Sequence, residues 1–262
     1  MTEGVFPFVP WTDGLPPKAV VLAGGRGTRL APYTSILPKP LMPIGDRSIL
    51  EVVLQQLEDC GIVDITLCVG YLSHLIKAVL AHCDLRGIDI SYVHEETALG
   101  TAAPLRLVGD LDDTFIAMNG DVLTTLDFNE LVRHHHAAGN LLTIATRVRS
   151  MKIDYGVLRV GADSRGRVEA YDEKPELTWT VSMGIYALEP AALEYIPPRG
   201  YFDVPDLVKA LLRAGEPVGA YEYDGLWFDI GRPQDYQQAV DAWFPEVTDD
   251  VDVDEIESAV TR

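Results

Sequence analysis

Short apolar runs alternate with stretches of helical spacing along the first half of this 262-residue chain. A continuous apolar run of strand length is typical of a parallel strand that neighbouring elements cover on both faces. These runs predict strands over residues 19–23, 65–69, 88–93 and 114–118.

Between the strands, apolar residues recur three and four positions apart, which is the spacing of one helix face. This spacing predicts helices from Ile49 to about residue 60, over 72–82 and over 101–107. Gly61 is well placed to end the first of them, because glycine readily adopts the left-handed conformation of a helix C-terminus.

The alternation of strand and helix predicts an α/β fold with a three-layer, doubly wound, mostly parallel sheet of the Rossmann-like type. The pattern changes later, where two strand-like runs at 156–160 and 167–171 flank a turn-forming segment at 161–166. Such a pair predicts a hairpin, and therefore an inserted antiparallel β element.

No internal repeat or low-complexity linker divides the middle of the chain. We therefore expect one working domain over residues 18–244. An extended, proline-rich leader at 1–17 is expected to precede it, and a solvated acidic tail at 245–262 to follow it.

The acidic composition narrows the classes of function. With 40 acidic and 21 basic residues the formal charge is −19, which argues against a surface that follows nucleic-acid phosphates. No apolar run approaches the ~18 residues of a membrane helix, and the N-terminus lacks the regions of a signal peptide. We expect a cytoplasmic protein that binds neither nucleic acid nor membranes, with Cys60, Cys68 and Cys83 as reduced thiols.

A glycine-rich loop follows the first predicted strand. In the segment Leu22–Leu30, three glycines allow backbone N–H groups to approach a phosphate closely, at the end of a strand where open α/β sheets bind ligands. A dinucleotide-binding loop would need a third spaced glycine where Leu30 stands, and no Gly-Lys-Ser/Thr follows for a Walker loop. A nicotinamide-dependent oxidoreductase is therefore disfavoured.

A proline-rich segment, residues 38–43, comes soon after this loop. Its prolines stiffen the backbone and would hold Lys39 near the glycines. Arg29 and Lys39 together could neutralise a triphosphate or a pyrophosphate. As an exposed cation, Lys39 is expected to contribute little to folding stability.

The stretch 22–43 resembles the signature of the sugar-phosphate nucleotidylyltransferases, and the likeness continues through six further motifs. These lie at residues 99–102, 119–121, 155–157, 173–175, 181–186 and 227–231. The resemblance is nearest to mannose-1-phosphate and heptose-1-phosphate guanylyltransferase-like members that lack a β-helix domain. It implies that a nucleoside triphosphate and a sugar 1-phosphate are joined to a nucleotide sugar, with release of pyrophosphate.

The resemblance also implies roles for matching residues. Catalytic residues would be Arg29, Lys39, Asp121 and Lys174. Nucleotide-binding residues would be Leu22, Ala23, Gly24, Gly25, Gly27, Thr28, Glu95, Gly100, Thr101, Asn119 and Gly120. Sugar-phosphate-binding residues would be Tyr155, Gly156, Glu173, Lys174, Ser182 and Gly184. Mg²⁺ would be bound by Asp121 and Asp229, and carboxylate oxygens after a buried strand are ligands that this ion prefers.

The nucleotide base is the hardest point to predict. Glu95 matches a position where uridine- and thymidine-using relatives carry Gln. A carboxylate only accepts hydrogen bonds, and guanine offers two adjacent donors, so Glu95 favours GTP. Because Glu96 is its neighbour, a shift of one residue would change the contact. UTP, dTTP or CTP as the nucleotide, and a catalytically silent subunit that senses nucleotide sugars, stay as alternatives.

Other features are less informative about function. Residues 134–136 are three consecutive histidines, which cannot chelate one ion from a helix, and we expect them on a solvated helix face. The sugar is open: mannose 1-phosphate, a heptose 1-phosphate or a cyclitol phosphate would present similar hydroxyls. Self-association into a homo-oligomer is common in the family, and no periodic apolar stripe in the sequence points to it independently.

Overall fold

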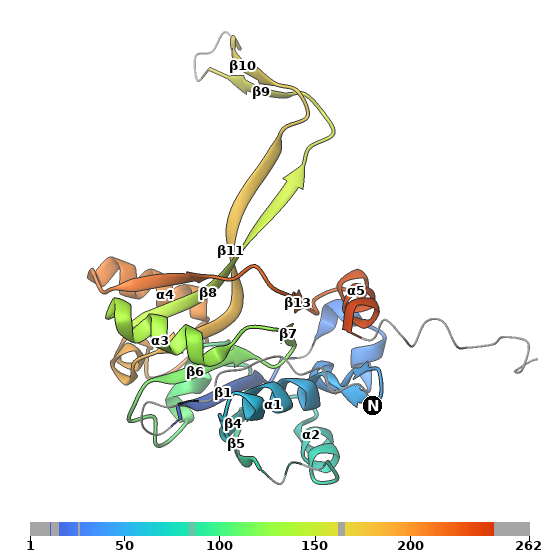
Figure 1. Ribbon diagram of the computed structural model, residues 1–262, viewed down its shortest axis with the longest axis vertical. Helices are drawn as coiled ribbons and strands as arrows, with labels where there is room; N and C mark the ends of the chain where they lie inside the picture. Colours follow the sequence, from blue (N-terminus) through green and yellow to red (C-terminus); the bar gives the residue numbers. More distant parts are fainter. Residues whose placement is uncertain are drawn as a thin grey trace, which may run out of the picture.

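A seven-stranded sheet forms the centre of the computed structural model, in the order β12-β8-β11-β6-β1-β4-β5 (Figure 1). β11 is antiparallel to both of its neighbours and the other four pairings are parallel. This confirms a mostly parallel sheet with an antiparallel element. The strands are β1 Lys18–Ala23, β4 Asp64–Val69, β5 Asp89–His94, β6 Phe115–Asn119, β8 Leu142–Lys152, β11 Glu176–Leu188 and β12 Val218–Glu222.

The structure describes residues 11, 16–25, 27–83, 85, 87–161 and 166–243. The acidic tail expected at 245–262 lies outside this part, as does most of the leader expected at 1–17. Within the described residues, no helix is both long enough and apolar enough to cross a lipid bilayer.

Helices cover both faces of the sheet, as the three-layer prediction required. On one face the core includes Val21 of β1 and side chains of α1 Ile49–Asp59, α2 Ser73–Leu80, α3 Phe128–Ala138 and α5 Pro233–Trp243. On the other face Val20 packs in a core with α4 Val204–Ala214. Adjacent residues of β1 thus enter opposite cores, which explains why the strand is apolar throughout.

The predicted elements agree closely with the observed ones at the start of the chain. α1 begins with a capping box: the Ser48 hydroxyl accepts a hydrogen bond from the Glu51 N–H, and the Glu51 carboxylate accepts one from the Ser48 N–H. Gly61 follows the helix with φ +79°, as predicted. The helix expected at 101–107 is a 3-10 helix over Ala103–Leu107.

The predicted hairpin is formed by β9 Val157–Val160 and β10 Val168–Asp172, which pair antiparallel. It lies at the end of β8 and β11, which run on together beyond the sheet as a two-stranded ribbon (Figure 1). We call residues 148–161 and 166–180 the arm.

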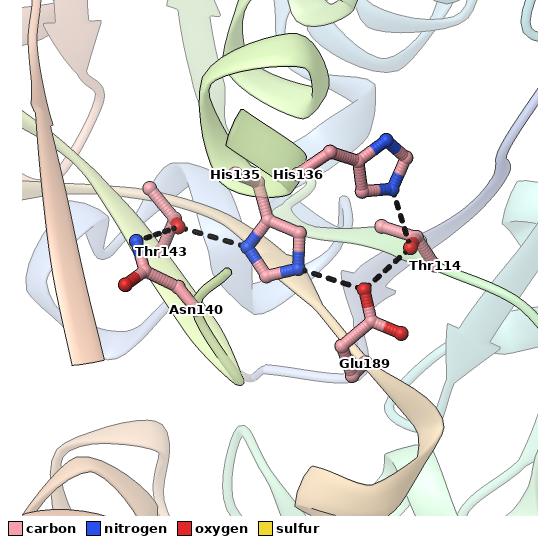
Figure 2. A network of polar contacts seen from close by, with 6 residues as sticks. All are labelled: Thr114, His135, His136, Asn140, Thr143 and Glu189. Atoms are coloured by element: carbon pink, nitrogen blue, oxygen red, sulfur yellow. Dashed lines mark hydrogen bonds and ion pairs between the residues drawn. The ribbon is translucent and has the colours of Figure 1, made fainter. Parts of the chain in front are cut away.

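The prediction of a solvated face for the three histidines of α3 is wrong at His135, which is fully buried. Figure 2 shows the ring bridging two elements: Nε2 lies 3.1 Å from a carboxylate oxygen of Glu189, and Nδ1 lies 2.8 Å from the Thr143 hydroxyl. His134 and His136 stay exposed. Consecutive helix residues point about 100° apart, so the middle histidine faces the sheet when its neighbours face solvent.

Burial lowers the pKa of His135, the hydrogen bond to the Glu189 carboxylate and its charge oppose this, and the neighbouring His136 and His134 lower the pKa further. The folded state therefore resists protonation of His135. We expect the free energy of unfolding to fall below about pH 6.5, by at most about 1.4 kcal/mol per pH unit from this residue. Urea titrations between about pH 7.5 and 5.5 measure it. His135→Gln should reduce this pH dependence, whereas the exposed His74→Gln should keep it.

Candidate active site

The carboxyl ends of β1 and β6 meet at the edge where the predicted site lies. The strands pair in parallel, with Leu22 opposite Asn119, and the Gly120 N–H donates to the Leu22 carbonyl at 2.9 Å. A Cβ at Gly120 would lie 3.1 Å from Val21 Cγ1 and 3.2 Å from the Leu22 oxygen. A side chain at Gly120 would therefore have to displace β1 slightly, which favours glycine where the turn at 119–121 lies against the Leu22 carbonyl and the Ala23 Cβ.

The glycine-rich loop closes onto the proline-rich segment. Gly27 has φ +59°, and a Cβ there would lie 3.0 Å from side-chain atoms of both Lys39 and Thr34. The Thr34 hydroxyl donates to the Gly27 carbonyl at 2.8 Å. Gly25 and Thr28 remain exposed at the mouth of the loop. Thr34 is a supporting residue that sequence analysis missed, because an isolated threonine between two motifs gives no signal.

Lys39 forms an ion pair with Asp121 beneath this loop. The residue is only 8% exposed, so the expectation of an exposed cation is wrong. It lies in a 3-10 turn, Lys39–Leu41, whose three residues are all buried. The prolines that stiffen this segment thus fix the lysine inside the protein, where a charge needs a partner.

A second carboxylate lies beside the first. β7 Val122–Thr124 and β13 Trp227–Asp229 pair antiparallel, with Asp229 opposite Val122, and the Ile230 N–H donates to the Asp121 carbonyl at 3.2 Å. Asp229 reaches solvent at the mouth of the site. Partial removal of the Asp229 carboxyl from water and the negative charge of Asp121 raise the pKa of Asp229, whereas the positive charges of Lys39 and Arg29 lower it. Two like charges held together in this way attract a cation.

Arg29 and Asp235 join Lys39, Asp121 and Asp229 in a group of five charged side chains. A Cβ at Gly231 would lie 3.6 Å from Arg29 Nη1 and 3.8 Å from Asp229 Oδ1, which places both around this glycine. Arg29 is exposed and Lys39 is buried. Among the described residues, no three side chains of the metal-binding types gather as a complete metal site. A divalent cation at Asp121 and Asp229 would therefore take its other oxygens from substrate and water, as Mg²⁺ commonly does.

Glu95 lies on the other side of the glycine-rich loop, just after β5. Its carboxylate occupies the space beside Gly24, where a Cβ would lie 2.2 Å from Oε1. The Leu99 N–H donates to Oε2 at 3.3 Å, and burial raises the pKa of the carboxyl. Glu96 is exposed. Of the two neighbouring glutamates, it is Glu95 that contacts the loop.

Gly100 and Thr101 are engaged within the protein. The Thr101 N–H donates to Asp203 Oδ1 at 2.9 Å, and its hydroxyl accepts from the Val204 N–H at 2.9 Å. A Cβ at Gly100, where φ is +89°, would lie 2.6 Å from the Phe202 oxygen. These contacts make Asp203 a positioning residue of the 95–101 loop. In the sequence, an Asp just before a Pro-containing helix start signals only a helix cap.

The residues predicted to border the sugar fall into two places. Gly184 lies against Asn119, with a Cβ position 2.6 Å from the Asn119 amide nitrogen, and has φ +76°. Ser182 lies just before it, at an irregularity in the pairing of β11 with β8, and its hydroxyl accepts from the Gly184 N–H at 3.2 Å. This strand therefore borders the Asn119–Asp121 turn.

Tyr155, Gly156, Glu173 and Lys174 lie instead on the arm, which extends away from the rest of the molecule (Figure 1). Tyr155 is 78% exposed, and Glu173 and Lys174 are exposed. The Glu173 carboxylate accepts from the Tyr171 hydroxyl at 2.5 Å, and Gly156 packs against the same tyrosine. All four therefore lie on the arm, where Tyr171 links Gly156 and Glu173, and the structure does not join them to Lys39 and Asp121.

A partly buried Lys–Asp pair, a second carboxylate and a glycine-rich loop gather at the carboxyl edge of a mostly parallel α/β sheet, the edge at which such sheets bind ligands. The family model for nucleotidyl transferases matches residues 18–243. The chain therefore belongs to this family, within its sugar-phosphate branch, as the motifs predicted.

Three similar proteins illustrate the range of relatives. UTP–glucose-1-phosphate uridylyltransferase of Synechocystis sp. is 33% identical over 243 residues, covering 85% of this chain and 62% of that protein. Mannose-1-phosphate guanylyltransferase catalytic subunit beta of Xenopus tropicalis is 34% identical over 226 residues, covering 84% and 62%. A structure described as a glucose-1-phosphate thymidylyltransferase of Bacillus anthracis has a TM-score of 0.67 at 24% identity, covering 86% and 94%, and shows the shared fold. The chain thus spans less than two thirds of these curated relatives' length.

Proposed function

We propose that this chain transfers a nucleotidyl group from a nucleoside triphosphate to a sugar 1-phosphate. The observation that carries the proposal is the cluster of Arg29, Lys39, Asp121 and Asp229 beside the glycine-rich loop. Two anionic substrates must approach one another in this reaction, so the site needs cations more than it needs a general base.

In the proposed reaction an oxygen of the sugar phosphate forms a bond to the α-phosphorus, and the bond from that phosphorus to the bridging oxygen breaks. Pyrophosphate leaves with the bond's electron pair. Backbone N–H groups of Gly24–Gly25 and Gly27–Thr28 would hold the phosphates, and Arg29 would neutralise the leaving pyrophosphate. Lys39, fixed by Asp121, would stabilise the charge on the transferring group from beneath the loop.

Asp121 and Asp229 are suited to hold Mg²⁺, because they are two adjacent carboxylates with room for substrate oxygens. When bound there, the ion would neutralise charge on the phosphate undergoing transfer. A catalytically silent subunit would have no need to keep Arg29, Lys39 and both carboxylates in one cluster.

GTP is the nucleotide that we propose, and the position of Glu95 supports it. Its carboxylate, which accepts hydrogen bonds and donates none, lies against the loop that would hold the phosphates. The adjacent N1–H and N2–H₂ donors of guanine suit a carboxylate, whereas uracil and thymine offer one donor between two acceptors.

Glu95→Gln should lower kcat/KM for GTP by about tenfold to a hundredfold and raise the relative use of UTP, because the amide supplies a donor. Burial raises the pKa of Glu95, so kcat/KM for GTP should fall with decreasing pH sooner than an ordinary glutamate would cause. Steady-state kinetics of the two nucleotides measure both effects. The exposed Glu96→Gln is the matched control, and an equal change in both variants would refute the role of Glu95.

The proposed function is tested by pyrophosphate release with Mg²⁺, for GTP, ATP, UTP, CTP and dTTP against a panel of sugar 1-phosphates. The panel includes mannose 1-phosphate, heptose 1-phosphates and a cyclitol phosphate. Release with GTP and one acceptor is the expected result. Release with UTP or dTTP would keep the reaction and discard the proposed base. No release from the folded protein with any pair would contradict the proposal.

A further inference from the structure

The arm exposes many large apolar side chains. Nine of them are between 38% and 78% exposed, namely Val148, Met151, Tyr155, Leu158, Val160, Val168, Tyr171, Leu177 and Trp179. The arm is a two-stranded ribbon, and its hairpin pairs with no other described strand. Isolated two-stranded ribbons are marginally stable, and exposed apolar patches with free strand edges mark surfaces that another chain covers.

The arm also carries Glu173 and Lys174, the residues expected to bind the acceptor phosphate. Nine residues lie between Lys174 and Gly184, which borders the site. At the rise of a strand they span roughly 30 Å, far more than the length of a sugar phosphate. The continuous pairing with β8 keeps this stretch extended, and the arm that carries Lys174 points away from the rest of its own chain, where Lys39 lies (Figure 1).

The base of the arm is fixed to the body, which opposes folding of the arm back onto its own site. β8 and β11 pair without interruption from Thr146↔Ser182 to Lys152↔Glu176. Next to this ladder, the Arg147 guanidinium donates to the Gly225 carbonyl, and the Arg149 guanidinium lies 4.9 Å from the centre of the Trp227 ring. Bending the arm inward would break these contacts beside Asp229.

The charge of the arm permits a second copy of this chain to cover it. Residues 148–180 contain six basic and six acidic residues, whereas the whole chain has 21 and 40. Because the arm is neutral, the rest of each copy carries the net charge of −19. Two such copies repel each other at close range, over a screening length of about 10 Å. A neutral, apolar arm that reaches beyond this distance can contact a second body without that repulsion.

We propose that two copies of this chain exchange arms, so that the elbow at Glu173–Lys174 of one copy completes the substrate site of the other. The left-handed backbone of Lys174, with φ +46°, turns the ribbon at this elbow. The exposed apolar side chains pack against the partner copy. The assignment of Lys174 to the acceptor phosphate rests on the proposed function, whereas the exchange of arms does not.

Sedimentation of the full chain tests the exchange of arms without any substrate. We expect a species of twice the 28.8 kDa chain mass. Leu158→Asp on the arm should convert the dimer to the monomer. Leu212→Asp on α4 is the matched control, because Leu212 is 59% exposed and Leu158 is 53% exposed, and it should leave the dimer intact. A monomeric wild-type chain, or a dimer that Leu158→Asp leaves intact, would overturn the proposal.

Mixing inactive variants tests whether the site is shared. Asp121→Asn and Lys174→Ala each disable one half of the site. When the two variants are co-expressed, half of the dimers contain one copy of each, and each such dimer has one intact site out of two. Co-expression should therefore restore about a quarter of wild-type activity. Asp121→Asn with Asp229→Asn, both in the body, should restore none. Active wild-type protein without restoration in the first pair would overturn the shared site. An inactive wild-type chain would refute the proposed function, and sedimentation would still decide the exchange of arms.

Discussion

Asp121→Asn should lower kcat by about three orders of magnitude, equivalent to about 4 kcal/mol of transition-state stabilisation. The carboxylate has two tasks in the site. It pairs with the buried Lys39, and with Asp229 it forms the pair that is suited to Mg²⁺. An amide keeps the shape of the side chain and removes the charge that both tasks need. Pyrophosphate release under saturating substrates measures the loss.

Circular dichroism should show that Asp121→Asn keeps the fold, because the turn that carries it is held by backbone bonds to Leu22 and Ile230. Urea unfolding should show a lower free energy of unfolding, because the buried Lys39 loses its charged partner. The exposed Asp112→Asn, on a loop elsewhere, serves as the matched control and should retain full activity. Near-normal turnover by Asp121→Asn would contradict the assignment of this carboxylate.

Lys39→Met should lower kcat by about a hundredfold to a thousandfold and also lower the free energy of unfolding by about 1–3 kcal/mol. The methionine fills the same buried channel without the charge. It leaves Asp121 and Asp229 facing each other without the buried cation that now neutralises them. Kinetic assays and urea unfolding measure the two effects separately.

The double variant Lys39→Met/Asp121→Asn separates the two effects, since it removes the unpaired charge together with the cation. We expect most of the lost stability to return while activity stays absent. Lys209→Met removes the lysine of an exposed Lys–Asp pair and should change stability by less than about 0.5 kcal/mol. Equal stability losses for Lys39→Met and the double variant would show that Lys39 does not stabilise the protein through its ion pair with Asp121.

The strands, the first helix and the hairpin could be predicted because their signals are local. A five-residue apolar run such as 19–23 is typical of a covered strand, and Gly61 ends a helix through its own backbone freedom. The position of the glycine-rich loop also follows locally, since it begins directly after a strand. The candidate site residues were then predicted from the family resemblance.

The state of individual side chains could not be predicted in this way. Lys39 is buried and paired with a residue 82 positions away, and His135 is buried between neighbours that are exposed. Both outcomes depend on which surface packs over the residue. A sequence motif gives the type of a residue but does not predict which segments pack over it.

The sequence by itself thus determined the class of fold, the position of the glycine-rich loop and the family, because strand periodicity, glycine backbone freedom and motif spacing are properties of contiguous residues. Only the tertiary structure decided that Asp229 lies beside Asp121, that Glu95 rather than Glu96 contacts the loop, and that Lys174 lies on an extended arm. These are relations between segments many residues apart. Strand pairing, burial and electrostatic balance fix them only when the whole chain has folded.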